Sequence, residues 1–218
     1  MRLADALTLS RLVIAPLAAA AYLWLPAPAC WWVPLALCAA AELSDWLDGR
    51  IARARGEVSE FGQLADPFCD AFYRMALCMA LVLPAGGRGV AVGAEAAADQ
   101  WQPVYAVADA AGQLQLGAGL LPWLPVALMV LRELAQGALR SLCAARGLVL
   151  AARWSGKAKA WVQGALLIAA LALAALSAGD PVILVPCALG AWAAAALSVA
   201  SFVEYLWVHR RALAEAVR

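Results

Sequence analysis

Long runs of apolar residues, each bounded by polar or helix-breaking positions, dominate the hydrophobic pattern of this chain. An α-helix needs about 20 apolar residues to cross the roughly 30 Å hydrocarbon core of a bilayer. Runs of that length predict six helices, at residues 7–26, 31–51, 66–85, 121–145, 156–178 and 181–208. Proline and glycine end several runs, since they break helices where the chain reverses. The expected fold is an all-α integral membrane protein with six transmembrane helices.

The composition agrees with that expectation. Of the 218 residues, 66% are hydrophobic and 14% are charged, whereas a soluble domain has about 45–50% apolar and about 25% charged residues. A soluble domain and a disordered chain are both excluded on these figures. The six cysteines show no Cys-x-x-Cys spacing, so neither a zinc site nor a redox site is predicted. We expect one membrane-embedded domain over residues 1–218, with a long outer loop at residues 86–120.

Lysine and arginine indicate the orientation, because these residues resist translocation across the membrane. Most of the sixteen lie at the N-terminus or near the helix ends that would meet on one side. Both termini are therefore predicted to be cytoplasmic, in a protein of the inner cell membrane. A cleaved signal peptide at residues 1–29 is the alternative for the first run. Arg11 inside the apolar stretch argues against it.

Four aspartates gather near the predicted cytoplasmic edge. Asp45 and Asp48 lie near the end of the second predicted helix, and Asp66 and Asp70 open the third. Spacings of three and four residues place each pair on one helical face, and the short connection makes the two helices antiparallel neighbours. Converging carboxylates suit Mg²⁺ or Mn²⁺, and a pair of such cations is usual for displacement at phosphorus. The sequence thus predicts a site for two divalent cations.

The residues around these aspartates favour a phosphate-containing ligand. Gly49, Ala52 and Gly62 leave the nearby backbone bare, which makes room for a bulky phosphate group. Arg53 stands one turn from Gly49 and can bind a phosphate oxygen. Arg74 stands one turn beyond the last aspartate. It is either an ion-pair partner of that aspartate or a further phosphate ligand.

Together these positions read Asp-x-x-Asp-Gly-x-x-Ala-Arg, eight further residues, and Gly-x-x-x-Asp-x-x-x-Asp, from Asp45 to Asp70. The pattern resembles the signature of the CDP-alcohol phosphatidyltransferase family at all its fixed positions. The resemblance implies a six-helix membrane enzyme, typically a homodimer, whose site faces the cytoplasm. The aspartates would hold the two cations, with Asp70 also the general base. The remaining signature residues would line the pocket for the lipid substrate CDP-diacylglycerol: Gly49, Ala52, Arg53 and Gly62.

Arg132 and Glu133 lie inside the fourth predicted helix, where a charge is costly and marks a functional candidate. Adjacent residues on a helix do not face one another, so each is expected to need a partner elsewhere. One alternative is a structural salt bridge, for example between Arg132 and Glu42. The other is a polar cavity that Arg132 lines together with three further cations, Arg140, Lys157 and Lys159. Four cations around one pocket would suit a small anionic acceptor.

Three segments resemble phosphatidylglycerophosphate synthases. They are Leu131-Arg132-Glu133 through Arg140, then Trp154-Ser155-Gly156-Lys157-Ala158-Lys159, and the opening Leu7-Thr8-x-x-Arg11 with Pro16. This resemblance implies glycerol 3-phosphate as the acceptor.

The chain departs from those synthases at Asp5-Ala6, Ala71 and Ala160. The same reaction with inositol phosphate, serine or phosphatidylglycerol as acceptor is therefore an alternative. A divalent-cation transporter is an alternative of another class, because intramembrane aspartates also mark ion pathways. No nucleic-acid partner is expected.

Overall fold

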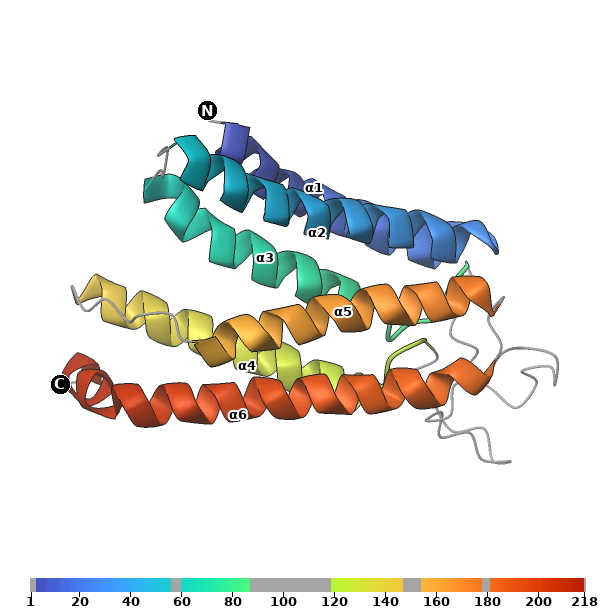
Figure 1. Cartoon of the computed structure of the whole chain (residues 1–218). Coiled ribbons are helices and arrows are strands. Elements are labelled where there is room, and N and C mark those ends of the chain that lie inside the picture. The colour runs from blue at the N-terminus through green and yellow to red at the C-terminus, as the bar shows by residue number, and fades with distance from the viewer. Residues whose placement is uncertain (1–2, 56–59, 87–118, 147–153, 178–180, 218) are drawn as a thin grey trace.

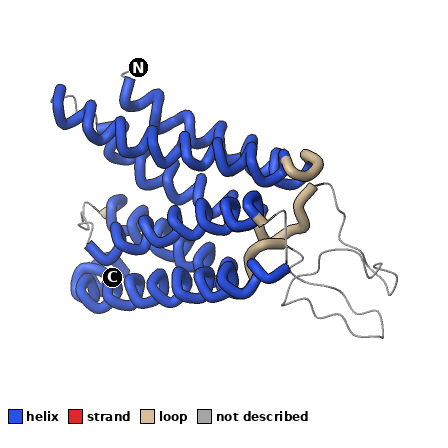
Figure 2. Tube along the Cα trace, turned by 45° about the vertical axis from the view of Figure 1, so that its right-hand side comes forward, coloured by secondary structure: helices blue, strands red, loops and turns tan. Residues whose placement is uncertain are grey.

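The computed structural model describes residues 3–55, 60–86, 119–146, 154–177 and 181–217. Every regular element among them is helical (Figures 1 and 2). The elements are α1 (Leu3–Trp24), α2 (Ala29–Arg55), α3 (Glu60–Ala80), α4 (Trp123–Ala145), α5 (Trp154–Leu176), the short 3₁₀ helix η1 (Pro181–Ile183) and α6 (Leu184–Val217). The predicted all-α class is confirmed, and the α-helices follow the order of the predicted segments.

The helix ends differ from the prediction where polar residues extend an apolar run. α3 begins at Glu60 instead of residue 66, although its other end is earlier than predicted, at Ala80 instead of residue 85. α6 continues beyond residue 208 to Val217. Polar residues such as glutamate, glutamine and arginine are good helix formers, so a helix does not stop where its apolar stretch stops. Hydropathy therefore located the helices better than it located their ends.

The helices form two groups of three that lie against each other. α1 contacts α2 and α3 in the first group, and α6 contacts α4 and α5 in the second. Contacts of α5 with α2 and α3, and of α3 with α4, join the groups. Successive helices run in alternating directions, and the two termini lie toward the same end of the bundle (Figure 1). Buried alanines, among them Ala15, Ala18, Ala191 and Ala194, allow the helix backbones to approach closely.

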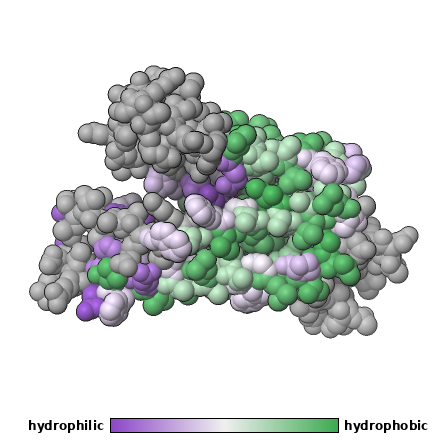
Figure 3. Space-filling view, viewed as in Figure 1, coloured by the Kyte–Doolittle hydropathy of each residue, from purple (hydrophilic) through white to green (hydrophobic). Residues whose placement is uncertain are grey.

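Apolar side chains also cover much of the surface. Within the described residues, Ala158–Leu176 and Leu184–Arg210 are long and apolar enough to cross a membrane, and Thr8–Trp24 and Ala29–Ser44 are shorter apolar helices. Figure 3 shows hydrophobic residues over much of the visible face and hydrophilic residues toward the end where α6 finishes. Exposed apolar surface of this extent marks a membrane contact rather than a water-facing surface. The count of six spans and the cytoplasmic termini stay predictions.

The chain on the two sides of the predicted outer loop is hydrogen-bonded to α1 and to the residue that follows α3. The Gly86 N–H donates to the Tyr22 carbonyl at 3.0 Å, with Gly86 in the left-handed region at φ 73°. A Cβ at Gly119 would lie 2.1 Å from the Leu81 carbonyl oxygen, so only glycine allows this close approach. The Leu121 N–H donates to the same carbonyl at 3.0 Å. Most of the predicted loop, residues 87–118, lies outside the described residues.

Candidate active site

The predicted aspartates lie on two helices that touch through side chains. α2 contains Asp45 and Asp48, and α3 contains Asp66 and Asp70. The Tyr73 hydroxyl of α3 donates to a carbonyl of α2 at 3.5 Å. Of the four carboxylates, only that of Asp70 belongs to the described part of the structure. The other three side chains lie outside it, together with the remaining signature residues, Gly49, Ala52, Arg53 and Gly62.

Two arginines hold the carboxylate of Asp70, one on each oxygen. Nη1 of Arg11, from α1, lies 3.3 Å from Oδ1, and Nη1 of Arg74, one turn along α3, donates to Oδ2. The Arg11 side chain is 1% exposed, whereas that of Asp70 is 24% exposed. Charge-assisted hydrogen bonds of this kind are directional, so both oxygens of Asp70 are oriented while the carboxylate stays accessible. Arg74 is thus an ion-pair partner of Asp70, the first of the two roles expected for it.

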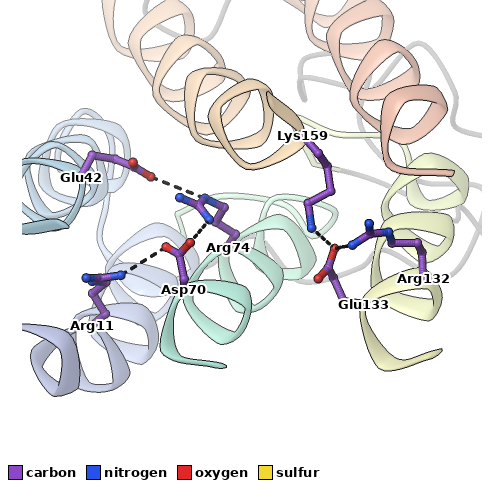
Figure 4. A network of polar contacts seen from close by, with 7 residues as sticks. All are labelled: Arg11, Glu42, Asp70, Arg74, Arg132, Glu133 and Lys159. Carbon is purple, nitrogen blue, oxygen red and sulfur yellow. Dashed lines mark hydrogen bonds and ion pairs between the residues drawn. The ribbon is translucent and has the colours of Figure 1, made fainter. Parts of the chain in front are cut away.

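A further carboxylate continues this network. Nε of Arg74 lies 3.8 Å from Oε1 of Glu42, on α2. The four side chains form one connected group across α1, α2 and α3 (Figure 4). The sequence reasoning missed Glu42 in this role and did not pair Arg11 with Asp70. The available signal was the presence of both charges inside apolar runs, where a charge needs a partner.

A second network lies in the other helix group. Nη1 of Arg132 donates to Oε1 of Glu133 at 2.7 Å, and Nζ of Lys159 on α5 donates to the same oxygen (Figure 4). Arg132 also donates from Nε to the Ser198 carbonyl at 3.1 Å and from Nη2 to the Ser201 hydroxyl at 2.7 Å, both on α6. Glu133 and these serines therefore tie α4 to α5 and α6.

Arg132 and Glu133 each have the expected partner on another helix, Ser201 and Lys159, but two details of the expected pairing of Arg132 are wrong. It contacts Glu133 although the two are adjacent, because its guanidinium lies at the end of a long flexible side chain that can turn back toward its neighbour. It does not contact Glu42, which instead pairs with Arg74 in the other helix group. Helix periodicity describes where a side chain leaves the backbone. It does not describe where a guanidinium several bonds away ends up.

The predicted acceptor cations are only partly brought together. Arg132 and Lys159 meet on Glu133, and both are buried. Arg140 lies farther along α4, with its guanidinium carbon 5.9 Å from the centre of the Tyr205 ring on α6. The side chain of Lys157 lies outside the described residues. The structure thus links α4, α5 and α6 through these cations, and acceptor binding by them stays a prediction.

Replacing Arg132 with methionine is expected to destabilise the protein. The substitution leaves the Glu133 carboxylate with one cation fewer, and losing one partner of a buried ion pair costs roughly 3 kcal/mol or more. Thermal unfolding in detergent should show a melting temperature lower by roughly 5–10 °C. Arg146→Met is the matched control, because Arg146 follows the same helix and is exposed. Equal melting temperatures for the two variants would contradict a stabilising role of this network.

A bundle of apolar helices that carries buried and half-buried networks of charged side chains is typical of one class, the membrane proteins with a polar functional site. The particular family follows from comparison with known proteins. The family model for CDP-alcohol phosphatidyltransferase matches residues 1–203, and the chain belongs to that family. A search of curated proteins finds no match.

Family membership establishes the type of reaction. The protein is a transferase of phospholipid biosynthesis, which moves a phosphatidyl group from a CDP-alcohol to an acceptor alcohol. The apolar helices and the family together indicate a membrane protein. The alternative of a divalent-cation transporter is thereby set aside.

The family uses divalent metal ions, and the donor chemistry of this chain fits them. Carboxylate oxygens are the ligands that Mg²⁺ and Mn²⁺ prefer. Each oxygen of Asp70 retains acceptor capacity beyond the bond to its arginine, because an ionised carboxylate offers about four lone-pair positions. Within the described residues there is no group of three or more potential ligands. The predicted cluster depends on Asp45, Asp48 and Asp66 as well.

Proposed function

We propose that this transferase uses CDP-diacylglycerol as the donor and glycerol 3-phosphate as the acceptor, and releases CMP. The observation that carries the catalytic part is the partly exposed carboxylate of Asp70, oriented by Arg11 and Arg74. The acceptor is supported by the segments that resemble phosphatidylglycerophosphate synthases. The same resemblance supports a homodimer with six spans in the inner membrane and a site that faces the cytoplasm.

In this proposal Asp70 is the general base. It accepts the proton of the acceptor hydroxyl, whose oxygen then forms a bond to the phosphorus attached to the lipid alcohol. The bond from that phosphorus to the oxygen of CMP breaks, and CMP leaves with the electron pair. Arg11 and Arg74 keep the carboxylate directed during the proton transfer, since each contacts one of its oxygens.

The remaining signature residues bind the donor. Asp45, Asp48, Asp66 and Asp70 hold two divalent cations, Mg²⁺ or Mn²⁺, which neutralise charge on the diphosphate when bound. Arg53 binds a phosphate oxygen. The pocket for the CDP-lipid is lined by Gly49, Ala52, Arg53 and Gly62, whose small members let the nucleotide approach the helix backbone.

The acceptor phosphate is proposed to lie near the basic residues of α4 and α5. Arg140 and Lys157 contact it directly. Arg132 and Lys159 do not contact the phosphate but contribute positive charge nearby, at the point where both are paired with Glu133. Two cations on one carboxylate leave an excess of positive charge in this part of the bundle, which favours an anionic acceptor over serine.

The acceptor is tested by CMP release. The purified protein in detergent is given CDP-diacylglycerol with labelled cytidine and one acceptor at a time: glycerol 3-phosphate, inositol phosphate, serine or phosphatidylglycerol. Of these acceptors, we expect only glycerol 3-phosphate to give rapid release of CMP. Release with another alcohol and none with glycerol 3-phosphate would contradict the acceptor assignment and leave the transferase assignment intact.

Neutralising Arg140 or Lys157 is expected to weaken acceptor binding. Each substitution to glutamine removes a charge-assisted bond worth roughly 1.5–3 kcal/mol, which corresponds to a roughly 10- to 100-fold higher KM for the acceptor. The KM for the CDP-lipid should change little, because the proposed diphosphate ligands are elsewhere. Arg146→Gln serves as the control for loss of one exposed charge. A lower melting temperature with both KM values unaltered would instead indicate a structural role.

A further inference from the structure

A glycine on α5 faces the carboxylate of Glu42 on α2. A Cβ built at Gly164 would lie 2.8 Å from Oε1 of Glu42 and 3.1 Å from its carboxyl carbon. Both distances are shorter than van der Waals contact. The buried Gly164 therefore provides the space that the Glu42 carboxylate occupies, at a point where α2 and α5 meet.

The same oxygen of Glu42 faces the catalytic network. Oε1 lies 3.8 Å from Nε of Arg74, while Nη1 of Arg74 donates to Asp70 (Figure 4). One continuous series of contacts thus runs from the backbone of α5 through Glu42 and Arg74 to Asp70. Arg74 is buried, and the two carboxylates lie on different parts of its guanidinium. Displacing one carboxylate therefore changes the forces that hold the other.

We propose that Glu42 and Gly164 are positioning residues for the transferase reaction. Gly164 confines the Glu42 carboxylate, Glu42 directs the guanidinium of Arg74, and Arg74 directs the carboxylate of Asp70. The proposal rests on the proposed function in one respect, the action of Asp70 as the general base. Neither Glu42 nor Gly164 contacts the substrates in this account, so their effect is on turnover and not on substrate affinity.

The geometry makes Gly164→Ala a mild change for the fold. The group nearest to the new methyl is the end of a flexible side chain, which can rotate away without moving a backbone. Alanine is also a better helix former than glycine by about 0.8–1.0 kcal/mol. The variant should therefore fold normally while its Glu42 carboxylate leaves the position that faces Arg74. If Gly164 served only the stability of the fold, Gly164→Ala would cause no loss of turnover.

The test compares Gly164→Ala with Gly137→Ala in the full-length protein. Gly137 is exposed on α4, and a Cβ there meets no atom within 4 Å. At saturating CDP-lipid and acceptor, kcat of Gly164→Ala should fall about 3- to 30-fold, the size expected for a change transmitted through contacts. Its two KM values should stay within the range of the unmodified protein, and its melting temperature should be equal or slightly higher. Gly137→Ala should leave kcat and both KM values unchanged, and its melting temperature should likewise be equal or slightly higher.

A double-mutant cycle identifies the route of the effect. Glu42→Ala should lower kcat by a similar factor, and adding Gly164→Ala to it should cost nothing further, because the methyl then has no carboxylate to displace. Glu42→Gln keeps an oxygen at the same position and should retain more turnover than Glu42→Ala. Independent, multiplicative losses would overturn the proposal.

Asp70→Asn, measured in the same assay, separates the possible failures. If Asp70→Asn abolishes turnover while Gly164→Ala has a normal kcat, the positioning proposal is wrong and the proposed function stands. If Asp70→Asn retains near-normal turnover, the general base is wrongly assigned and the positioning proposal falls with it. Both proposals are supported if Asp70→Asn and Gly164→Ala each lower kcat and if the losses caused by Glu42→Ala and Gly164→Ala do not add in the double variant.

Discussion

Asp70→Asn is expected to lower the turnover number by at least about 100-fold, the usual contribution of a general base. Asparagine has nearly the shape of aspartate and keeps one oxygen toward Arg11 or Arg74, but it cannot accept the proton of the acceptor hydroxyl. Because the donor is bound through several other residues, binding of the CDP-lipid should largely survive. CMP release and CDP-lipid binding, measured on the same preparation, separate the two effects.

Asp109→Asn is the matched control for this substitution, because it makes the same chemical change in the predicted outer loop. It should have the turnover of the unmodified protein. Near-normal turnover of Asp70→Asn would contradict the assignment of the base. A loss of turnover accompanied by a large loss of thermal stability would show that the ion pairs of Asp70 hold the bundle together, and the comparison of binding would then decide the assignment.

Removal of divalent cations is expected to abolish activity. Four carboxylates without cations would repel the diphosphate of the donor, since all these groups are negatively charged. EDTA should therefore reduce CMP release to background, and excess Mg²⁺ or Mn²⁺ should restore it. Restoration by each ion in turn identifies the preferred metal.

The control for the chelator is its manganese-saturated form, which takes up neither Mg²⁺ nor further Mn²⁺ but has the same effect on detergent and ionic strength. Metal content is measured after dialysis. Full activity in a preparation shown to be free of metal would contradict a metal-dependent mechanism. An unchanged melting temperature without metal would show that the cations serve the reaction and not the fold.

Local sequence information was enough for the helical class and for contacts within one helix. Apolar runs of membrane length predicted the helices in their observed order. The four-residue spacing of Asp70 and Arg74 placed both on one face of α3, where they form an ion pair. The family signature needed only short spacings, and the family match agrees with it. In each case the decisive residues are near neighbours in the chain, and helical geometry alone relates them.

Contacts between helices were decided by the tertiary structure. Arg11 meets Asp70 across 59 residues of sequence, and Arg132 meets Ser201 across 69. The periodicity of a helix tells which residues share a face, but not which face of which other helix that face will meet. The choice depends on how all the helices pack together and on the requirement that each buried charge find a partner. For this reason the sequence predicts a catalytic role for Asp70, while only the packing of α1 and α2 against α3 shows which side chains of other helices join its ion-pair network.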